Sequence, residues 1–411
     1  MRVQRQILGR VIFASLLASI APALSAQGQN RASEPAPAKS LPAAEAAIAT
    51  PATSAVPSAK EESKSPLTDK DAKPADKSIP TAQPHVALIL PLASKTLGKV
   101  ADAVKQGFLA GAAADGKNAP PHRIYAAEDE GGSLVTQYRK AASDAAAIVI
   151  GGMTRDGASI MAREASYLPS LALNAPVSTT PAGDADLPER FFHISLNLDW
   201  EARLAARAAA NDGFRRVAVI NAASPLAKRI QDSFEKEWIR LGGEVAVRIP
   251  FGNELGEGSR VSGAMEKANA DAVFIAAEVR VARFARPYLP SGMPVFATSL
   301  TIDPRANAIE NLDLESVRFM EMPWFVQPDH PAVMAYSRPT EVMPIDFERL
   351  YALGIDAWRV AQVMLANQKA KSIPPLDGVT GRITLDGHQF VRQLAAGEIR
   401  DGRPTLFKPV E

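Results

Sequence analysis

The residue types that most often perform catalysis are few and scattered in this chain of 411 residues. None of the five histidines belongs to a His-Glu-x-x-His pattern, with which a helix holds catalytic zinc. The chain contains no cysteine, which excludes disulfides, thiol catalysis and cysteine-based metal sites. We expect no metal and no cofactor, and we assign structural or surface roles to the histidines, which are His85, His122, His193, His330 and His388.

One Ser-x-x-Lys match, Ser233 to Lys236, has the spacing found in penicillin-reactive enzymes. The Ser-Asp-Asn and Lys-Thr-Gly motifs that accompany the reactive serine are missing, and Phe234 places the match inside an amphipathic helix. We therefore attribute the match to chance. The chain also lacks a Gly-x-Ser-x-Gly elbow and a Gly-x-x-x-x-Gly-Lys phosphate loop, so its motifs indicate no catalytic reaction.

The elements that would position a binding site are six short apolar runs. Each run ends in a small or polar residue and leads into a stretch with helical character. Parallel α/β sheets show this pattern because their buried strands are almost continuously apolar, and their ligands bind beyond the carboxyl ends of the strands. The predicted strands are Val86–Leu90, Ile148–Ile150, Leu171–Leu173, Val217–Ile220, Val273–Ile275 and Val295–Ala297.

Small and hydroxyl residues at these strand ends have two interpretations. They can capture a small carboxylate or phosphate at helix N-termini, or they can serve as the turns and caps that any strand-to-helix junction needs. No arginine or aspartate stands at an obvious ligand-clamping position, which favours turns and caps. The candidate cleft residues are Leu92, Ser94, Gly152, Met153, Thr154, Asn174, Asn221, Glu278, Thr298 and Ser299.

Apolar residues between the predicted strands recur at helical spacing, as Val100, Val104 and Phe108 do. Asn197 or Asp199 can cap a further helix that begins close behind them. The chain thus alternates strand and helix, first over residues 86–196 and again over residues 216–300. This repetition predicts an α/β fold with two doubly wound lobes and a hinge.

The region after residue 300 adds elements to lobes that are already complete. An amphipathic helix is predicted over 347–368, and strands over 378–385 and 390–399. Such late elements predict that the chain crosses between the lobes more than once. We therefore divide the folded region 85–411 into a first lobe of about 85–197 plus 320–372 and a second lobe of about 198–319 plus 373–411.

The first 84 residues differ in composition from the rest. Residues 1–26 have a basic start, an apolar stretch and small residues at the end, which predicts a signal peptide and export to the periplasm. Residues 27–84 are rich in Ala and Pro and poor in large apolar residues, which predicts a disordered linker. The net charge of +1 predicts neither nucleic-acid nor membrane-surface binding, and the lack of cysteine leaves no residue for a lipid anchor.

Met322 and Trp324, on either side of Pro323, are candidates for a partner interface, because Trp and Met are enriched at interface cores. Their alternative role is ordinary core at the crossover between lobes. Arg349 and Arg359 lie on the long predicted helix and are interpreted as solvated.

Several motifs, taken in order, resemble the carboxyl-terminal domain of the LpoA/LppC family. Thr298-Ser299 is followed by Glu-Met-Pro-Trp at 321–324, by Arg-Leu-Tyr-Ala-Leu-Gly-Ile-Asp-Ala at 349–357 and by Gly-Val-Thr-Gly at 378–381. Earlier segments agree over essentially all of residues 85–411. They are Ala-Leu-Ile-Leu-Pro-Leu at 87–92, Gln-Gly-Phe-Leu-Ala at 106–110, Ile-Gly-Gly at 150–152 and Leu-Ala-Leu-Asn at 171–174.

This resemblance implies a type I periplasmic-binding-protein-like fold. It also implies a non-enzymatic regulator that binds and activates a class A penicillin-binding protein, the synthase that polymerises and crosslinks peptidoglycan. Well-studied family members are outer-membrane lipoproteins with an N-terminal helical-repeat domain, and this chain has an Ala/Pro-rich segment in that place. Two other hypotheses stand beside the regulator: a periplasmic solute-binding protein for an amino acid or similar small ligand, and a cryptic enzyme.

Overall fold

The structure is a computed structural model that describes residues 83–165, 168–177, 186–252, 256–367 and 373–407. All of these residues belong to one compact unit. The predicted signal peptide lies outside the described residues, and so does the predicted linker apart from residues 83 and 84. Among the described helices, none is long and apolar enough to cross a membrane.

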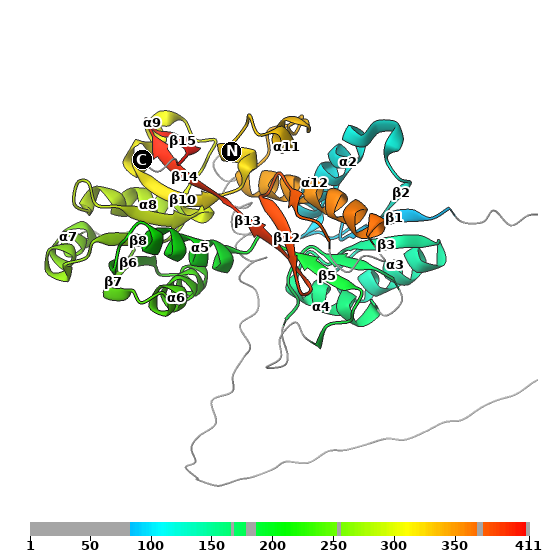
Figure 1. The fold of residues 1–411 in the computed structure, drawn as a ribbon, viewed down its shortest axis with the longest axis horizontal. Helices are drawn as coiled ribbons and strands as arrows, with labels where there is room; N and C mark the ends of the chain where they lie inside the picture. The colour runs from blue at the N-terminus through cyan, green and yellow to red at the C-terminus, as the bar shows by residue number, and fades with distance from the viewer. Residues whose placement is uncertain (1–82, 166–167, 178–185, 253–255, 368–372, 408–411) are drawn as a thin grey trace, which may run out of the picture. The chain divides into compact units, whose positions relative to one another are not determined.

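The first lobe is built on an eight-stranded sheet, counted within the described residues, in the order β11-β12-β13-β5-β4-β3-β1-β2 (Figure 1). The strands from β13 to β2 run parallel, and β11 and β12 extend the sheet as antiparallel strands. Their bounds are β1 His85–Leu90, β2 His122–Ala126, β3 Ala146–Gly151, β4 Ser170–Ala172, β5 Phe191–Ile194, β11 Leu376–Asp377, β12 Arg382–Asp386 and β13 Gln389–Gln393.

The second lobe is built on a seven-stranded sheet, again within the described residues, in the order β15-β14-β10-β9-β8-β6-β7. The strands from β10 to β7 run parallel, whereas β14 and β15 are antiparallel additions at the edge. Their bounds are β6 Arg216–Ala222, β7 Glu244–Phe251, β8 Ala272–Ala276, β9 Val295–Thr298, β10 Val317–Glu321, β14 Ala395–Arg400 and β15 Arg403–Leu406.

Helices cover both faces of each sheet because alternate strand residues are buried on opposite sides. In β1, Val86, Leu88 and Leu90 pack with α2 and α12, whereas Ala87 and Ile89 pack with α3 and α4. The sheet of the second lobe lies in the same way between α5 and α6 on one face and α7 and α8 on the other. The two predicted doubly wound lobes are thus confirmed.

The helices carry the following bounds. The α-helices are α2 Gly98–Asp115, α3 Gly132–Ser143, α4 Arg155–Glu164, α5 Leu198–Asn211, α6 Pro225–Arg240, α7 Glu257–Ala268, α8 Val279–Ala285, α9 Ala308–Asn311, α10 Pro323–Val326, α11 Pro331–Met334 and α12 Ile345–Ala366. Short 3-10 helices are η1 Gly116–Asn118, η3 Arg286–Tyr288, η4 Ser299–Thr301 and η5 Leu312–Leu314.

All six apolar runs form strands, whereas β2, β5 and β7 are among the strands that were not predicted. β2 and β7 are edge strands of the parallel arrays, and both carry polar residues that hide the apolar pattern. The strand predicted over 390–399 is in fact two strands, because the chain leaves the first sheet after β13 and enters the second at β14.

The chain crosses between the lobes three times within the described residues: between β5 and α5, between β10 and α12, and between β13 and β14. More than one crossing was predicted. The predicted division differs from the sheet pairing at the C-terminal end, where 373–411 was assigned to the second lobe. The segment β11 to β13 pairs with the first sheet, and only β14 and β15 join the second.

The closest helix packing in the first lobe joins α2 and α12, which meet at two glycines. A Cβ atom at Gly107 would lie 1.8 Å from the Tyr351 carbonyl oxygen, and one at Gly354 would lie 2.2 Å from that of Val104. Since the opposing atoms belong to helix backbone, they cannot rotate away. Glycine at these positions therefore sets the distance between the two helices.

Substitution of Gly107 tests this packing. We expect Gly107→Ala to lower the free energy of unfolding by about 1–3 kcal/mol, the usual cost of overpacking. The matched control is Gly263→Ala in α7, where a Cβ would meet nothing within 4 Å. That variant should be neutral or stabilised by about 0.5–1 kcal/mol, because alanine is the better helix former. Urea denaturation of both variants measures the difference, and equal stabilities would contradict the account.

Candidate functional site

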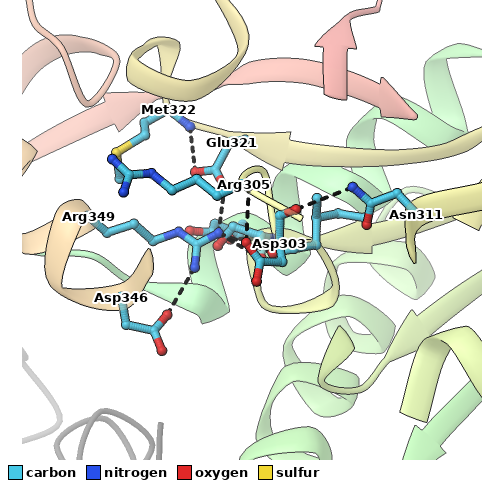
Figure 2. A network of polar contacts seen from close by, with 10 residues as sticks. Asp303, Arg305, Asn311, Glu321, Met322, Asp346 and Arg349 are labelled. Atoms are coloured by element: carbon cyan, nitrogen blue, oxygen red, sulfur yellow. Dashed lines mark hydrogen bonds and ion pairs between the residues drawn. The ribbon is translucent and has the colours of Figure 1, made fainter. Parts of the chain in front are cut away.

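Arg349 of α12 reaches from the first lobe into the second (Figure 2). Its Nη2 donates to Glu321 Oε2 at the end of β10, at 2.7 Å, and to the Ser299 carbonyl oxygen, at 3.0 Å. Its Nη1 donates to Asp346 Oδ1 at 3.0 Å. The residue is 5% exposed, so the sequence-based interpretation of Arg349 as solvated was wrong. Burial opposes the charge, but Glu321 and Asp346 outweigh it and raise the pKa of Arg349.

Glu201 of α5 adds a second buried carboxylate to this junction. Its Oε2 accepts the backbone N–H of Ser299 at 2.9 Å. Burial and the negative charge of Glu321 together raise the pKa of Glu201 to about 7, although the positive charge of Arg392 opposes this shift. The carboxyl group of Glu201 is therefore poised to change charge near neutral pH.

Arg392 of β13 is the second buried arginine of the junction. Its Nε donates to the Ser195 carbonyl oxygen at 2.9 Å, and its Nη1 donates to that of Thr380 at 3.1 Å. The Trp200 indole of α5 donates to the carbonyl oxygen of Arg392 at 2.9 Å. These bonds tie two of the three crossing segments together.

Met322 and Trp324, the candidates for a partner interface, are buried. They are 3% and 0% exposed, and the Trp324 indole donates to Glu348 Oε1 of α12 at 2.9 Å. The Arg338 guanidinium lies over the Trp324 ring, 3.9 Å from its centroid, and pairs with Glu348. The structure therefore assigns both residues to the core at the crossover between β10 and α12, as the alternative interpretation held.

A pocket of about 80 Å³ lies between α4 of the first lobe and α5 and α6 of the second. Arg229 of α6 pairs with Asp199 of α5 there, with 2.9 Å between Nε and Oδ1. The pocket is lined by Arg155, Asn174, Ala175, Ser195, Leu196, Asn197, Asp199 and Arg229.

Of the ten predicted cleft residues, only Asn174 lines this pocket, and its side chain donates to the Met153 carbonyl oxygen at 2.9 Å. Thr154 caps α4 by accepting the N–H of Gly157. Thr298 and Ser299 are buried near Arg349. The other predicted residues are not lining residues of the pocket; they are Leu92, Ser94, Gly152, Met153, Asn221 and Glu278.

Arg155, Asp199 and Arg229 line the pocket, although the sequence did not single them out as candidate site residues. Each of these residues lies in the first two turns of a helix that follows a strand: Arg155 in α4, Asp199 in α5 and Arg229 in α6. A charged residue directly behind a capping residue, such as Arg155 after Thr154, was the signal available in the sequence. The predicted cap of α5 is confirmed at Asn197, which accepts the N–H groups of Asp199 and Trp200.

The carboxylate of Glu130 accepts a hydrogen bond from the backbone at the start of α4. Its Oε2 accepts the Thr154 N–H at 3.1 Å, and a side chain at Gly157 would collide with it. Burial raises the pKa of Glu130 to about 7, against the hydrogen bonds from Thr154. The chain thus supplies its own carboxyl group to this helix N-terminus.

The sequence profile of the family described as "LppC putative lipoprotein" matches residues 79–254 and 250–402. The chain belongs to the LppC family. It is 24% identical over 283 residues to a "Penicillin-binding protein activator LpoA" of Enterobacter sp. (strain 638). That match covers 59% of this chain and 38% of the relative, so the chain spans well under half the length of that LppC relative.

Two solved structures show the same fold. The "LpoA (YraM) C-domain from Haemophilus influenzae, a regulator of PBP1A" is 20% identical, with a TM-score of 0.63, over 79% of this chain and 100% of that domain. A "putative branched-chain amino acid ABC transporter" from Chromobacterium violaceum ATCC 12472 is 33% identical, with a TM-score of 0.66, over 77% of this chain and 100% of that one. The predicted periplasmic-binding-protein-like fold and the LppC resemblance are both confirmed.

The buried carboxyl of Glu201 predicts a pH dependence of stability. Its pKa of about 7 in the folded state lies above the ordinary value of 4.5, so the folded state holds a proton that the unfolded state releases. Stability is therefore greatest below about pH 4.5 for this group and falls as the pH rises through 7. The full penalty above pH 7 is on the order of 3 kcal/mol.

We expect Glu201→Gln, which stays neutral, to flatten part of this dependence between pH 5 and 8. The pKa of Glu130 is raised in the same direction, so the variant keeps the part of the pH dependence that comes from Glu130. The matched control is Glu266→Gln on the exposed face of α7. Thermal denaturation across the pH range measures the effect, and an unchanged slope in Glu201→Gln would refute the assignment.

Proposed function

We propose that this chain is a non-enzymatic periplasmic regulator that binds and activates a class A penicillin-binding protein and so supports peptidoglycan synthesis. The observation that carries the proposal is its match to the LppC family, together with the full coverage of the H. influenzae LpoA C-domain by its two lobes. That domain is described as a regulator of PBP1A, and the Enterobacter relative as a penicillin-binding protein activator.

The chemistry of the described residues supports binding rather than catalysis. No group of three or more His, Asp or Glu residues in the described ranges is placed to hold a metal ion. The buried acids Glu201, Glu321 and Asp346 serve the junction between the lobes, where they contact Arg349 or Ser299 and do not line the pocket between α4, α5 and α6. The Ser-x-x-Lys match lies inside α6, with Phe234 fully buried.

For location, we propose export through the signal peptide at residues 1–26 and a tethering role for residues 27–84. The sequence contains no cysteine, so retention near the outer membrane would need an attachment other than a lipidated cysteine.

A surface on the second lobe is suited to hold the partner. α8 and η3 contact η5, which also contacts α9, and these neighbouring elements carry large apolar side chains that water reaches. Phe284 is 55% exposed and Ile309 80%, and Tyr288 and Leu312 are also exposed. Contiguous exposed apolar residues are common at protein interfaces, and aromatic residues contribute most to their affinity. We call these four residues the α8–η5 surface.

The proposal predicts that the purified chain raises the rate of glycan polymerisation by a purified class A synthase. Phe284→Ser should weaken this stimulation about tenfold or more in the concentration required, as loss of an interface anchor does. The matched control is Ile239→Ser on α6, a residue that is 59% exposed and lies outside the α8–η5 surface. If neither the wild type nor Ile239→Ser stimulated the synthase, the proposed function would be refuted. If Phe284→Ser and Ile239→Ser stimulated it equally, only the assignment of the α8–η5 surface would be refuted.

The second candidate function is solute binding. The 33% identity to the C. violaceum protein favours it, as does the pocket between the lobes. A thermal-shift screen with amino acids distinguishes it, because a ligand present at 100 times its dissociation constant stabilises the folded state by about 2.7 kcal/mol.

A further inference from the structure

The pocket between α4, α5 and α6 lies where two helices from different lobes begin. Arg155 is the first residue of α4, and Asn197 is the capping residue of α5. Helix N-termini carry a positive partial charge, which favours a bound anion. The pocket is therefore placed in a positive field supplied from both lobes.

Two buried polar atoms on the wall of this pocket have no hydrogen-bond partner. Within the described ranges, they are Ser195 Oγ and Arg155 Nε. Ser195 is only 8% exposed. Buried polar atoms are almost always satisfied, and leaving one without a partner costs free energy that a ligand atom can recover. Arg155 Nε can only donate a hydrogen bond and Ser195 Oγ can donate one, so a single acceptor group can satisfy both atoms.

The described residues that line the pocket carry one positive charge that no described residue of the lining balances. Asp199 pairs with Arg229 across α5 and α6, whereas Arg155 forms no ion pair with any described residue. Counted over the described residues, the lining has two arginines and one aspartate, an excess of one positive charge. A carboxylate supplies one negative charge and two coplanar acceptors, which match the geometry of a guanidinium.

Several backbone donors at both helix starts are already occupied. Glu130 accepts the Thr154 N–H, and Asn197 accepts the N–H groups of Asp199 and Trp200. The side chains of Arg155 and Ser195 are therefore the main donors that the pocket offers to a ligand. Its size is limited as well, because about 80 Å³ is far below the roughly 300–1,000 Å³ of pockets that enclose drug-sized ligands.

We propose that this pocket binds the carboxylate group of a small molecule, with Arg155 of the first lobe and Ser195 at the crossover as its donors. The Asp199–Arg229 pair forms the opposite wall, and its aspartate is available to a ligand that also carries an ammonium group. A bound carboxylate would join α4 to the second lobe and add a ligand-dependent contact between lobes. The inference rests on the second candidate function, solute binding, and not on the proposed activation of a synthase, so loss of acetate binding leaves the synthase assay unaffected.

The test is a titration of the full chain in which the NMR signals of the backbone amides of Asp199 and Trp200 report binding. Sodium acetate tests the carboxylate alone, alanine tests the added ammonium group, sodium phosphate tests a dianion, and sodium chloride controls for ionic strength. We expect saturable shifts with acetate and with alanine but none with chloride. Arg155→Gln should weaken the dissociation constants about tenfold or more, and Ser195→Ala several-fold.

The matched control is Arg163→Gln, which removes the same charge from the exposed last turn of α4, away from the pocket. It should bind acetate as the wild type does. Equal losses in Arg155→Gln and Arg163→Gln would show unspecific charge effects and overturn the proposal. So would the absence of saturable shifts with acetate and alanine, or tighter binding of phosphate than of acetate.

Discussion

The buried charge of Arg349 is the constraint on which the arrangement of the two lobes depends. A guanidinium removed from water is destabilising unless its charge is paired and hydrogen-bonded. Glu321, Asp346 and the Ser299 carbonyl oxygen accept from both Nη atoms of Arg349, and they come from β10, α12 and the turn after β9. Its Nε has no hydrogen-bond partner among the described residues. This side chain and the ion pair between Arg305 and Glu348 hold α12 against the second lobe. Glu201 and Arg392 extend the same network to α5 and β13, so all three crossing segments end in it.

This constraint explains how a fold with a hinge can serve as a regulator. In the proposed function, the partner meets a surface rather than a cleft, and a surface transmits binding only if the elements beneath it hold their places. The α8–η5 surface rests on the second sheet, whose β10 ends at the Arg349 junction. The small pocket on the other side of the crossovers adds a place where a carboxylate can bridge the same two lobes. Partner and ligand would therefore act on one junction.

Much of the fold was predictable because buried parallel strands have a strong apolar pattern. His85–Leu90 is buried throughout, and its alternate residues contact helices on both faces, so its sequence alone marks it as a strand. Edge strands such as β2 lack that pattern. The junction was not predictable, because nothing near Arg349 in the sequence shows that its partner is Glu321, 28 residues away. Arg155 and Arg229 were missed for the same reason: their shared pocket exists only once α4 and α6 are folded against the crossovers.

The coupling of the two lobes through Arg349 is tested most directly by hydrogen exchange of the wild type and Arg349→Met. In the wild type, amides of β1 in the first lobe and β8 in the second should open with one common free energy. The variant leaves Glu321 and Asp346 buried without their cation, so we predict a loss of about 3–5 kcal/mol and separate opening of the two strands. Arg163→Met, on the exposed end of α4, is the control and should behave as the wild type does. Unchanged and common opening of β1 and β8 in Arg349→Met would contradict the account.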